Sequence, residues 1–126
     1  MRANLIAIKK PGYEAAELTR AIRRDGAGTV RVSAIVRCLL GGVLQVALEG
    51  APDGADWSEV AVWHATAPGC WTLGEASIRF PWLRARVWVA NDRKRSGNFS
   101  CAAIAELALL ECKDLAAEDP PQEIAS

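Results

Sequence analysis

The chain has 126 residues, which is enough for one domain with one hydrophobic core and too few for two. Apolar residues make up 51% of it, charged residues 24%, and the formal net charge is zero, so the totals point to neither a nucleic-acid partner nor an acidic membrane. Charge is unevenly distributed, however. Residues 1–37 hold eight Lys/Arg against three Asp/Glu (+5), and residues 101–126 hold one Lys against six Asp/Glu (−5). Such ends suit contact with each other or with different neighbours in an assembly, and solvated flanks are the alternative.

No segment resembles a targeting signal or a membrane span. Leu5–Ile8 is too short for the apolar part of a secretory signal, and residues 101–110 are short and interrupted by Glu106. We therefore expect a reducing compartment, in which cysteines stay as free thiols. The four cysteines are Cys38, Cys70, Cys101 and Cys112.

The first quarter of the chain predicts little regular structure. Leu5–Ile8 indicates a short strand that ends at Pro11-Gly12, residues 13–24 indicate an arm or a short helix, and residues 25–28 indicate a turn.

From Thr29 the apolar residues recur with a period of two, which is typical of strands. Gly41-Gly42 separates two such runs and predicts a β-hairpin, because both glycines can adopt a positive φ. A second turn is predicted at residues 51–54, where Pro52 presets φ and Gly54 supplies the left-handed position.

Further strands are predicted over residues 57–64, 70–80 and 82–89. Residues 99–110 are ambiguous: their Ala, Leu and Glu content favours a helix, whereas their position after a hairpin-type loop favours a final strand, which we prefer. With no strong helix between the strands, the pattern predicts an all-β, antiparallel two-sheet sandwich. The expected organisation is an N-terminal arm (1–28), a sandwich domain (29–112) and a flexible acidic tail (113–126).

The residues that could support catalysis are sparse. His64 is the single histidine, no nucleophile-elbow motif surrounds any serine, and the cysteines lack metal-site spacing. We expect no catalytic residue, no metal and no cofactor. The basic triplet 93–95 is interpreted as a solvated loop.

One strand carries a pattern typical of interfaces. Trp82, Arg84, Arg86 and Trp88 share a face of the predicted strand 82–89. This face is either packed under an arm or a loop, with guanidinium groups on indole rings, or is a contact surface, because Trp and Arg often anchor interfaces. The candidate partner-binding residues are these four together with Arg23 and Arg24 of the basic arm.

Residues 44–57 resemble a stretch with the pattern L-x-V-x-L-x-x-S-x-D-G-x-x-W in small bacteriophage structural proteins, with Ala51 where Ser is usual. Residues 82–87 and 97–101 are similar to two further strand motifs of the same proteins. The resemblance implies a jelly-roll-like sandwich in a virion protein, and a weaker similarity connects the chain to discoidin-like carbohydrate-binding modules.

The function expected from this resemblance is that of a capsid decoration or cement subunit, assembled into virions in the host cytoplasm. Its partners would be the major capsid protein or other virion proteins and further copies of itself, with no nucleic acid and no membrane. The alternatives are a module that binds glycans through exposed Trp, and a small enzyme that uses His64.

Overall fold

The computed structural model describes residues 3–10, 12–24, 28–91 and 101–111. Within them lie nine strands and one short 3-10 helix, η1 (Tyr13–Ala15). The strands are β1 (Ala3–Ile8), β2 (Glu17–Leu18), β3 (Ile22–Arg23), β4 (Gly28–Leu40), β5 (Gly42–Ala51), β6 (Ser58–Ala65), β7 (Gly69–Ile78), β8 (Trp82–Asn91) and β9 (Ala102–Glu111). No helix in these ranges is long and apolar enough to cross a membrane.

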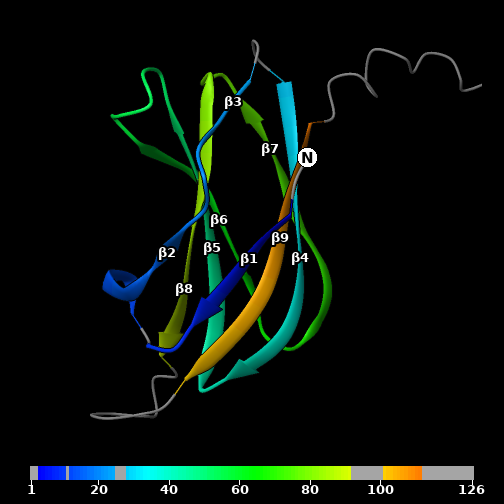
Figure 1. The fold of residues 1–126 in the computed structure, drawn as a ribbon. Coiled ribbons are helices and arrows are strands. Elements are labelled where there is room, and N and C mark those ends of the chain that lie inside the picture. Colours follow the sequence, from blue (N-terminus) through cyan, green and yellow to red (C-terminus); the bar gives the residue numbers. More distant parts are fainter. Residues whose placement is uncertain (1–2, 11, 25–27, 92–100, 112–126) are drawn as a thin grey trace, which may run out of the picture.

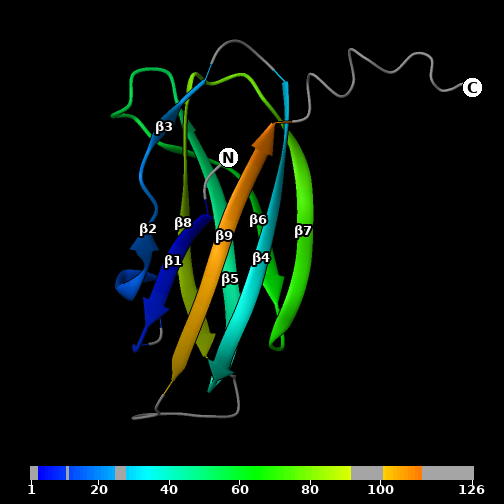
Figure 2. The same cartoon turned by 45° about the vertical axis from the view of Figure 1, so that its right-hand side comes forward.

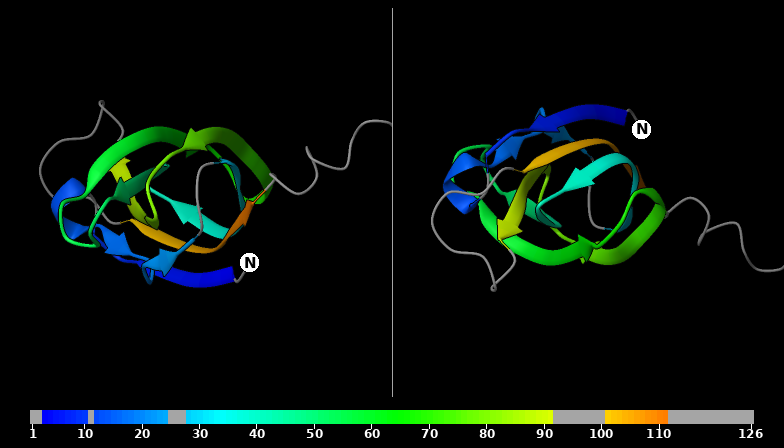
Figure 3. Two further views of the ribbon diagram at one scale, coloured as in Figure 1. Left: turned by 90° about the horizontal axis from the view of Figure 1, so that it is seen from above. Right: turned by 90° about the horizontal axis from the view of Figure 1, so that it is seen from below.

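The strands form two antiparallel sheets that face each other (Figures 1 and 3). Sheet A has the order β1-β9-β4-β7, and sheet B has the order β2-β8-β5-β6, with β3 also paired to β8. Figure 2 shows the four strands of sheet A side by side in front of sheet B. The predicted all-β sandwich is confirmed.

The strand pairs are nested along the chain. β5 pairs with β6, β4 with β7, β2 and β3 with β8, and β1 with β9. Moving outward from the β5–β6 turn, each strand before the turn pairs with the corresponding strand after it. The chain thus forms one long hairpin that is folded into two sheets. That nesting makes the fold a jelly roll.

The core lies between the sheets and follows the alternation seen in the sequence. In β4 the inward residues Val30, Val32, Ala34 and Val36 are buried, and in β8 the inward residue Val87 is fully buried. The outward residues of both strands keep contact with solvent. Period-two patterning therefore located these strands because one face of each is buried.

The two turns predicted from glycine have different outcomes. The turn predicted at residues 51–54 does lie in the connection between the paired strands β5 and β6, with Gly54 at a φ of 79°. Asp53 Oδ1 accepts hydrogen bonds from the backbone N–H groups of Asp56 and Ala55, both at 2.9 Å, and these bonds lower the pKa of Asp53.

The predicted hairpin at Gly41-Gly42 is wrong. β4 belongs to sheet A and β5 to sheet B, so the chain crosses from one sheet to the other at Gly41, whose φ is 81°. A tight hairpin turn and this crossing can each use a glycine in the left-handed region, so the glycine pair does not distinguish them.

Residues 102–111 form strand β9, as preferred from context over their helical propensity. β9 pairs with β1 on one side and with β4 on the other, so its backbone groups are satisfied across both edges. Tertiary pairing thus outweighs local propensity here.

The segment assigned to an N-terminal arm contributes strands to both sheets. Ile6 and Ile8 of β1 are buried in the core. The segment from Gly12 to Arg24 then follows β8 antiparallel, from the Gly12 N–H to Val89 O bond (2.8 Å) to the Arg24 N–H to Pro81 O bond (2.7 Å). The acidic segment 113–126 lies outside the described residues.

Candidate functional site: an aromatic and arginine-rich face

Strand β8 presents Trp82, Arg84, Arg86 and Trp88 on the outer side of sheet B, as the alternation predicted. All four are partly exposed. Across β5 they stand in register with Ala51, Glu49, Ala47 and Gln45 respectively. The two alanines have no exposed surface although they point outward, so the large β8 side chains cover their part of the sheet.

One carboxylate holds both arginines. The Arg84 Nε–H donates to Glu49 Oε1 at 2.7 Å, and the Arg86 Nε–H donates to Glu49 Oε2 at 3.0 Å. The Glu49 side chain is only 7% exposed, against 17% for Arg84 and 23% for Arg86. Such sharing fixes both guanidinium groups and compensates a carboxylate that would be costly to bury alone.

Aromatic rings from two other elements complete the stack. The Arg84 Cζ lies 4.2 Å from the ring centroid of Trp57, which follows the β5–β6 turn. The Arg86 Cζ lies 5.0 Å from the ring of Tyr13 in η1, and Tyr13 in turn packs edge-on against Trp88 with the ring centroids 4.9 Å apart. These distances are within the range of cation–π and edge-to-face contacts.

Trp82 lies at the start of β8, at the opposite end of the strand from Trp88. The Arg23 Cζ lies 5.8 Å from its ring centroid, and a Cβ added to Gly54 would lie 3.4 Å from the same ring. We call the set the aromatic–arginine face, made up of Tyr13, Arg23, Trp57, Trp82, Arg84, Arg86 and Trp88.

The sequence left two interpretations of the β8 face, a packed face and a surface that contacts a partner. The packing is present in the structure, because guanidinium groups and aromatic rings of the face lie on one another. The partner contact stays a prediction. Tyr13, Trp57 and Glu49 were missed as members. Their side chains join the face only through the pairing of β5 with β8 and the path of the N-terminal segment, and no local motif encodes either.

Arg24 does not belong to this face. Its side chain is 2% exposed and its Nε–H donates to Glu111 Oε2 at 2.7 Å, while Nη1 donates to the carbonyl oxygens of Ile78 and Phe80, both at 3.4 Å. Consecutive residues of an extended segment point to opposite sides, so Arg23 faces outward and Arg24 inward. Arg24 ties the end of β3 to the ends of β7 and β9 and does not present a binding group to a partner.

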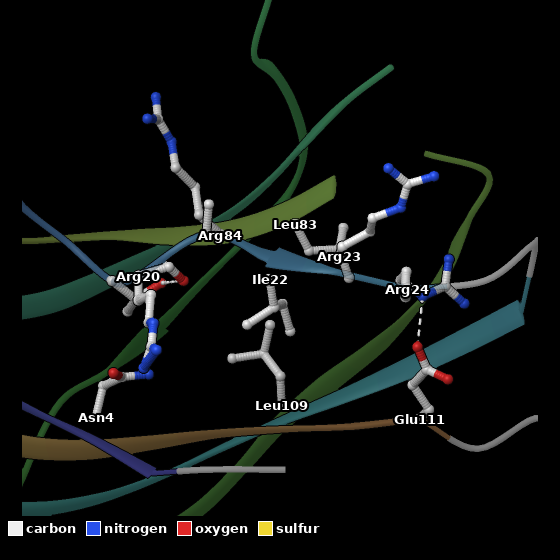
Figure 4. Close-up of a pocket in the computed structure, with 11 residues that line it drawn as sticks. Asn4, Arg20, Ile22, Arg23, Arg24, Leu83, Arg84, Leu109 and Glu111 are labelled. Atoms are coloured by element: carbon white, nitrogen blue, oxygen red, sulfur yellow. Dashed lines mark hydrogen bonds and ion pairs between the residues drawn. The ribbon is translucent and has the colours of Figure 1, made fainter. Parts of the chain in front are cut away.

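A pocket of about 580 Å³ opens between β3 and the β1–β9 side of sheet A. In Figure 4, Ile22 and Leu109 face each other in its middle, Arg20 extends toward Asn4 at one end, and the Arg24–Glu111 pair stands at the other. Arg23 and Arg84 extend away from the two aliphatic side chains. The pocket is therefore a slot with an apolar middle and polar ends, and Arg24 at one end is already paired with Glu111.

The residues considered for catalysis are dispersed. His64 is exposed on β6 in sheet B, whereas Cys70 is exposed on β7 in sheet A. Cys38 and Cys101 are also free, and burial raises the pKa of the Cys101 thiol. Among the residues that the structure describes, no three His, Cys, Asp or Glu side chains gather as metal ligands. The basic triplet 93–95 and Cys112 lie outside those residues.

In comparisons with known proteins, no protein family and no curated protein matches the chain. The fold and the face together define a jelly-roll domain with an ordered, cationic and aromatic outer surface on sheet B.

Proposed function

We propose that the chain is a bacteriophage virion structural protein, a capsid decoration or cement subunit that bridges neighbouring subunits of the shell. Its partners are then the major capsid protein or other virion proteins, its location is the virion, and its role is binding without catalysis. Two observations support the proposal. The jelly roll is a fold common in viral capsid proteins, and the sequence resembles small phage structural proteins.

The observation that carries the proposal is the composition and order of the aromatic–arginine face. Trp, Tyr and Arg are the residue types that most often anchor protein interfaces. Three arginines of the face stand against the carboxylate of Glu49 and that of Glu59, its exposed cross-strand neighbour on β6. This leaves one positive charge in excess for an acidic partner surface.

The face is also ordered before any partner arrives. Arg84 and Arg86 are each held by Glu49 and by a ring, so binding would freeze few additional rotamers. A subunit that binds only the assembled lattice would stabilise that lattice by mass action.

Replacing an anchor should weaken binding to shells. For Trp88→Ala and for Arg86→Ala we expect affinity for undecorated shells to fall by about 1–3 kcal/mol each, because interface energy concentrates in a few Trp and Arg side chains. The measurement is co-sedimentation of purified protein with shells of the phage that encodes it, across a range of protein concentrations.

The matched control is Arg79→Ala, since Arg79 is an exposed arginine outside the face. It should bind shells like the wild type. Wild-type protein that fails to co-sediment with shells contradicts the proposed function. Shell binding that both face variants retain contradicts only the choice of face.

The glycan alternative has less support. Sugars stack on open aromatic faces, whereas Trp57 already lies against Arg84, Trp88 against Tyr13, and Trp82 beside Arg23. A protein that binds a defined glycan on an array and ignores shells would replace the virion proposal with this one. Loss of a measured activity in His64→Ala would favour an enzyme instead.

A further inference from the structure

The outer side of sheet A carries more exposed apolar side chains than is usual for the solvent-facing side of an antiparallel sheet. Five of the eight large apolar side chains that are exposed among the described residues lie there. They are Leu5 (69% exposed), Ile35 (40%), Leu40 (62%), Ile104 (41%) and Leu110 (43%). In β9 the outward residues of the alternation are Ala102, Ile104, Glu106, Ala108 and Leu110, so this strand is mostly apolar on both faces. That pattern is typical of strands covered on both sides.

The charges on this side balance. Within the strands of sheet A, the outward charged residues form two ion pairs, Arg31 with Glu75 at 2.8 Å and Arg37 with Glu106 at 2.8 Å. The surface is thus formally neutral and would not repel a copy of itself.

The surface also has a projection on one side and a hollow on the other. Leu5 projects from the edge strand β1, while a hollow of about 350 Å³ lies at β4 and β7, where the ladder is irregular between Val32 and Ser33. The hollow is lined by Ser33, Ile35, Cys70, Thr72, Glu106 and neighbouring residues. β1 and β7 are the two edges of sheet A (Figure 2).

The projection and the hollow stand at the same height along the strands. Leu5 is in register with Glu106, Glu106 with Ile35, and Ile35 with Cys70, so these residues form one row across the sheet. A two-fold axis parallel to the strands, placed above the sheet, turns a second copy face to face and sets its β1 over the β7 of the first. Heights are unchanged by that rotation, so Leu5 of each copy lies over Cys70 of the other.

We propose that two copies of this chain pack through the outer faces of sheet A about such a two-fold axis, with Leu5 of each copy in the hollow beside Cys70 of the other. An interface of this kind is self-complementary, as the symmetry of a dimer requires. Four strands about 4.8 Å apart with lengths of about ten residues give a footprint of roughly 600 Å², which approaches the roughly 800 Å² per partner of a standard interface. The aromatic–arginine face remains free on the far side of each copy.

The first test is the oligomeric state of the wild-type protein and of two lysine variants, by sedimentation equilibrium up to about 100 µM. We expect a dimer that Ile104→Lys weakens at least about tenfold, because the substitution places a charge in both halves of the interface. Val62→Lys is the matched control: Val62 is also 41% exposed, but it lies on β6 of sheet B, and its variant should dimerise like the wild type. A wild-type protein that stays monomeric overturns the proposal, as does a dimer that both lysine variants leave intact.

The second test addresses the geometry. In Leu5→Cys, a short bismaleimide should link the new thiol to Cys70 of the other copy, since its reach matches the about 10 Å between stacked sheets, and a covalent dimer should appear on a denaturing gel. The link should vanish in Leu5→Cys combined with Cys70→Ser. Both variants are made with Cys38→Ser, because Cys38 is a free thiol in the same cross-strand row as Ala7. In that background Ala7→Cys, on the same strand and face as Leu5 but two residues away, should link to Cys70 far less.

Equal cross-linking of the two new cysteines would overturn the register. A monomeric protein in which Ile104→Lys abolishes binding to shells would overturn the proposal too, and would assign this surface to the shell.

Discussion

Glu49 has the most demanding position of any single residue in the aromatic–arginine face. Its side chain is 7% exposed, and each of its oxygens accepts a hydrogen bond from one arginine of β8. Losing one member of a buried ionic group costs more than the group contributes, because the remaining charges stay desolvated without a partner.

Neutralising this carboxylate should therefore destabilise the folded protein. For Glu49→Gln we expect the free energy of unfolding to fall by about 2–4 kcal/mol, since Arg84 and Arg86 would then face each other without an anion. Urea denaturation followed by tryptophan fluorescence measures the change.

Glu75→Gln provides the comparison, because Glu75 also pairs with an arginine but both side chains are more than 40% exposed. Exposed pairs contribute little, so this variant should lose less than about 1 kcal/mol. Equal losses in the two variants would show that the Glu49 cluster is no more than a surface ion pair.

At the scale of elements, β1 departs furthest from its expected role. It is an edge strand near the start of the chain, yet Ile6 and Ile8 fill the space between the sheets beside β9. The sequence indicated the strand but not its place. A six-residue segment with two isoleucines on one face has the same sequence pattern whether it forms a loose arm or a strand paired in a sheet.

The integration of β1 can be tested by truncating one side chain on each face. Ile6→Ala should lower the free energy of unfolding by about 2–4 kcal/mol, because it leaves a cavity in the core. Leu5→Ala, on the exposed face, should change it by less than about 0.5 kcal/mol when measured at a concentration too low for association. A negligible effect of Ile6→Ala in thermal or urea unfolding would show that β1 does not contribute to the core and behaves as an arm.

At the scale of the whole molecule, the nested pairing places the first and the last described strands side by side. The outermost pair joins Ala3–Ile8 to Ala103–Ala108, so almost the full sequence separates the two partners. Pairing of distant segments costs loop entropy before contacts repay it, and folding slows as this separation grows.

We therefore expect refolding in milliseconds to seconds, as for other sandwiches rich in non-local pairs. Stopped-flow dilution from urea, followed by tryptophan fluorescence, measures the rate. Completion within microseconds would mean that local contacts dominate and would be difficult to reconcile with this topology.

The sequence alone determined the alternation of β4, β5 and β8, the turn at Pro52-Asp53-Gly54 and hence the all-β class, because each depends on residues close together in the chain. In β6 a register shift in its ladder with β5 moves Val62 outward and Trp63 toward the core, so simple alternation does not describe that strand. Only the tertiary structure decided which strands share a sheet. That choice made Gly41 a crossing between sheets, placed β1 beside β9, and set Glu49 opposite Arg84. It also separated Arg23 from Arg24, turning one outward beside Trp82 and burying the other against Glu111. Strand pairing is a property of the two partners and their register, and the pattern of either strand by itself specifies only which of its faces is apolar.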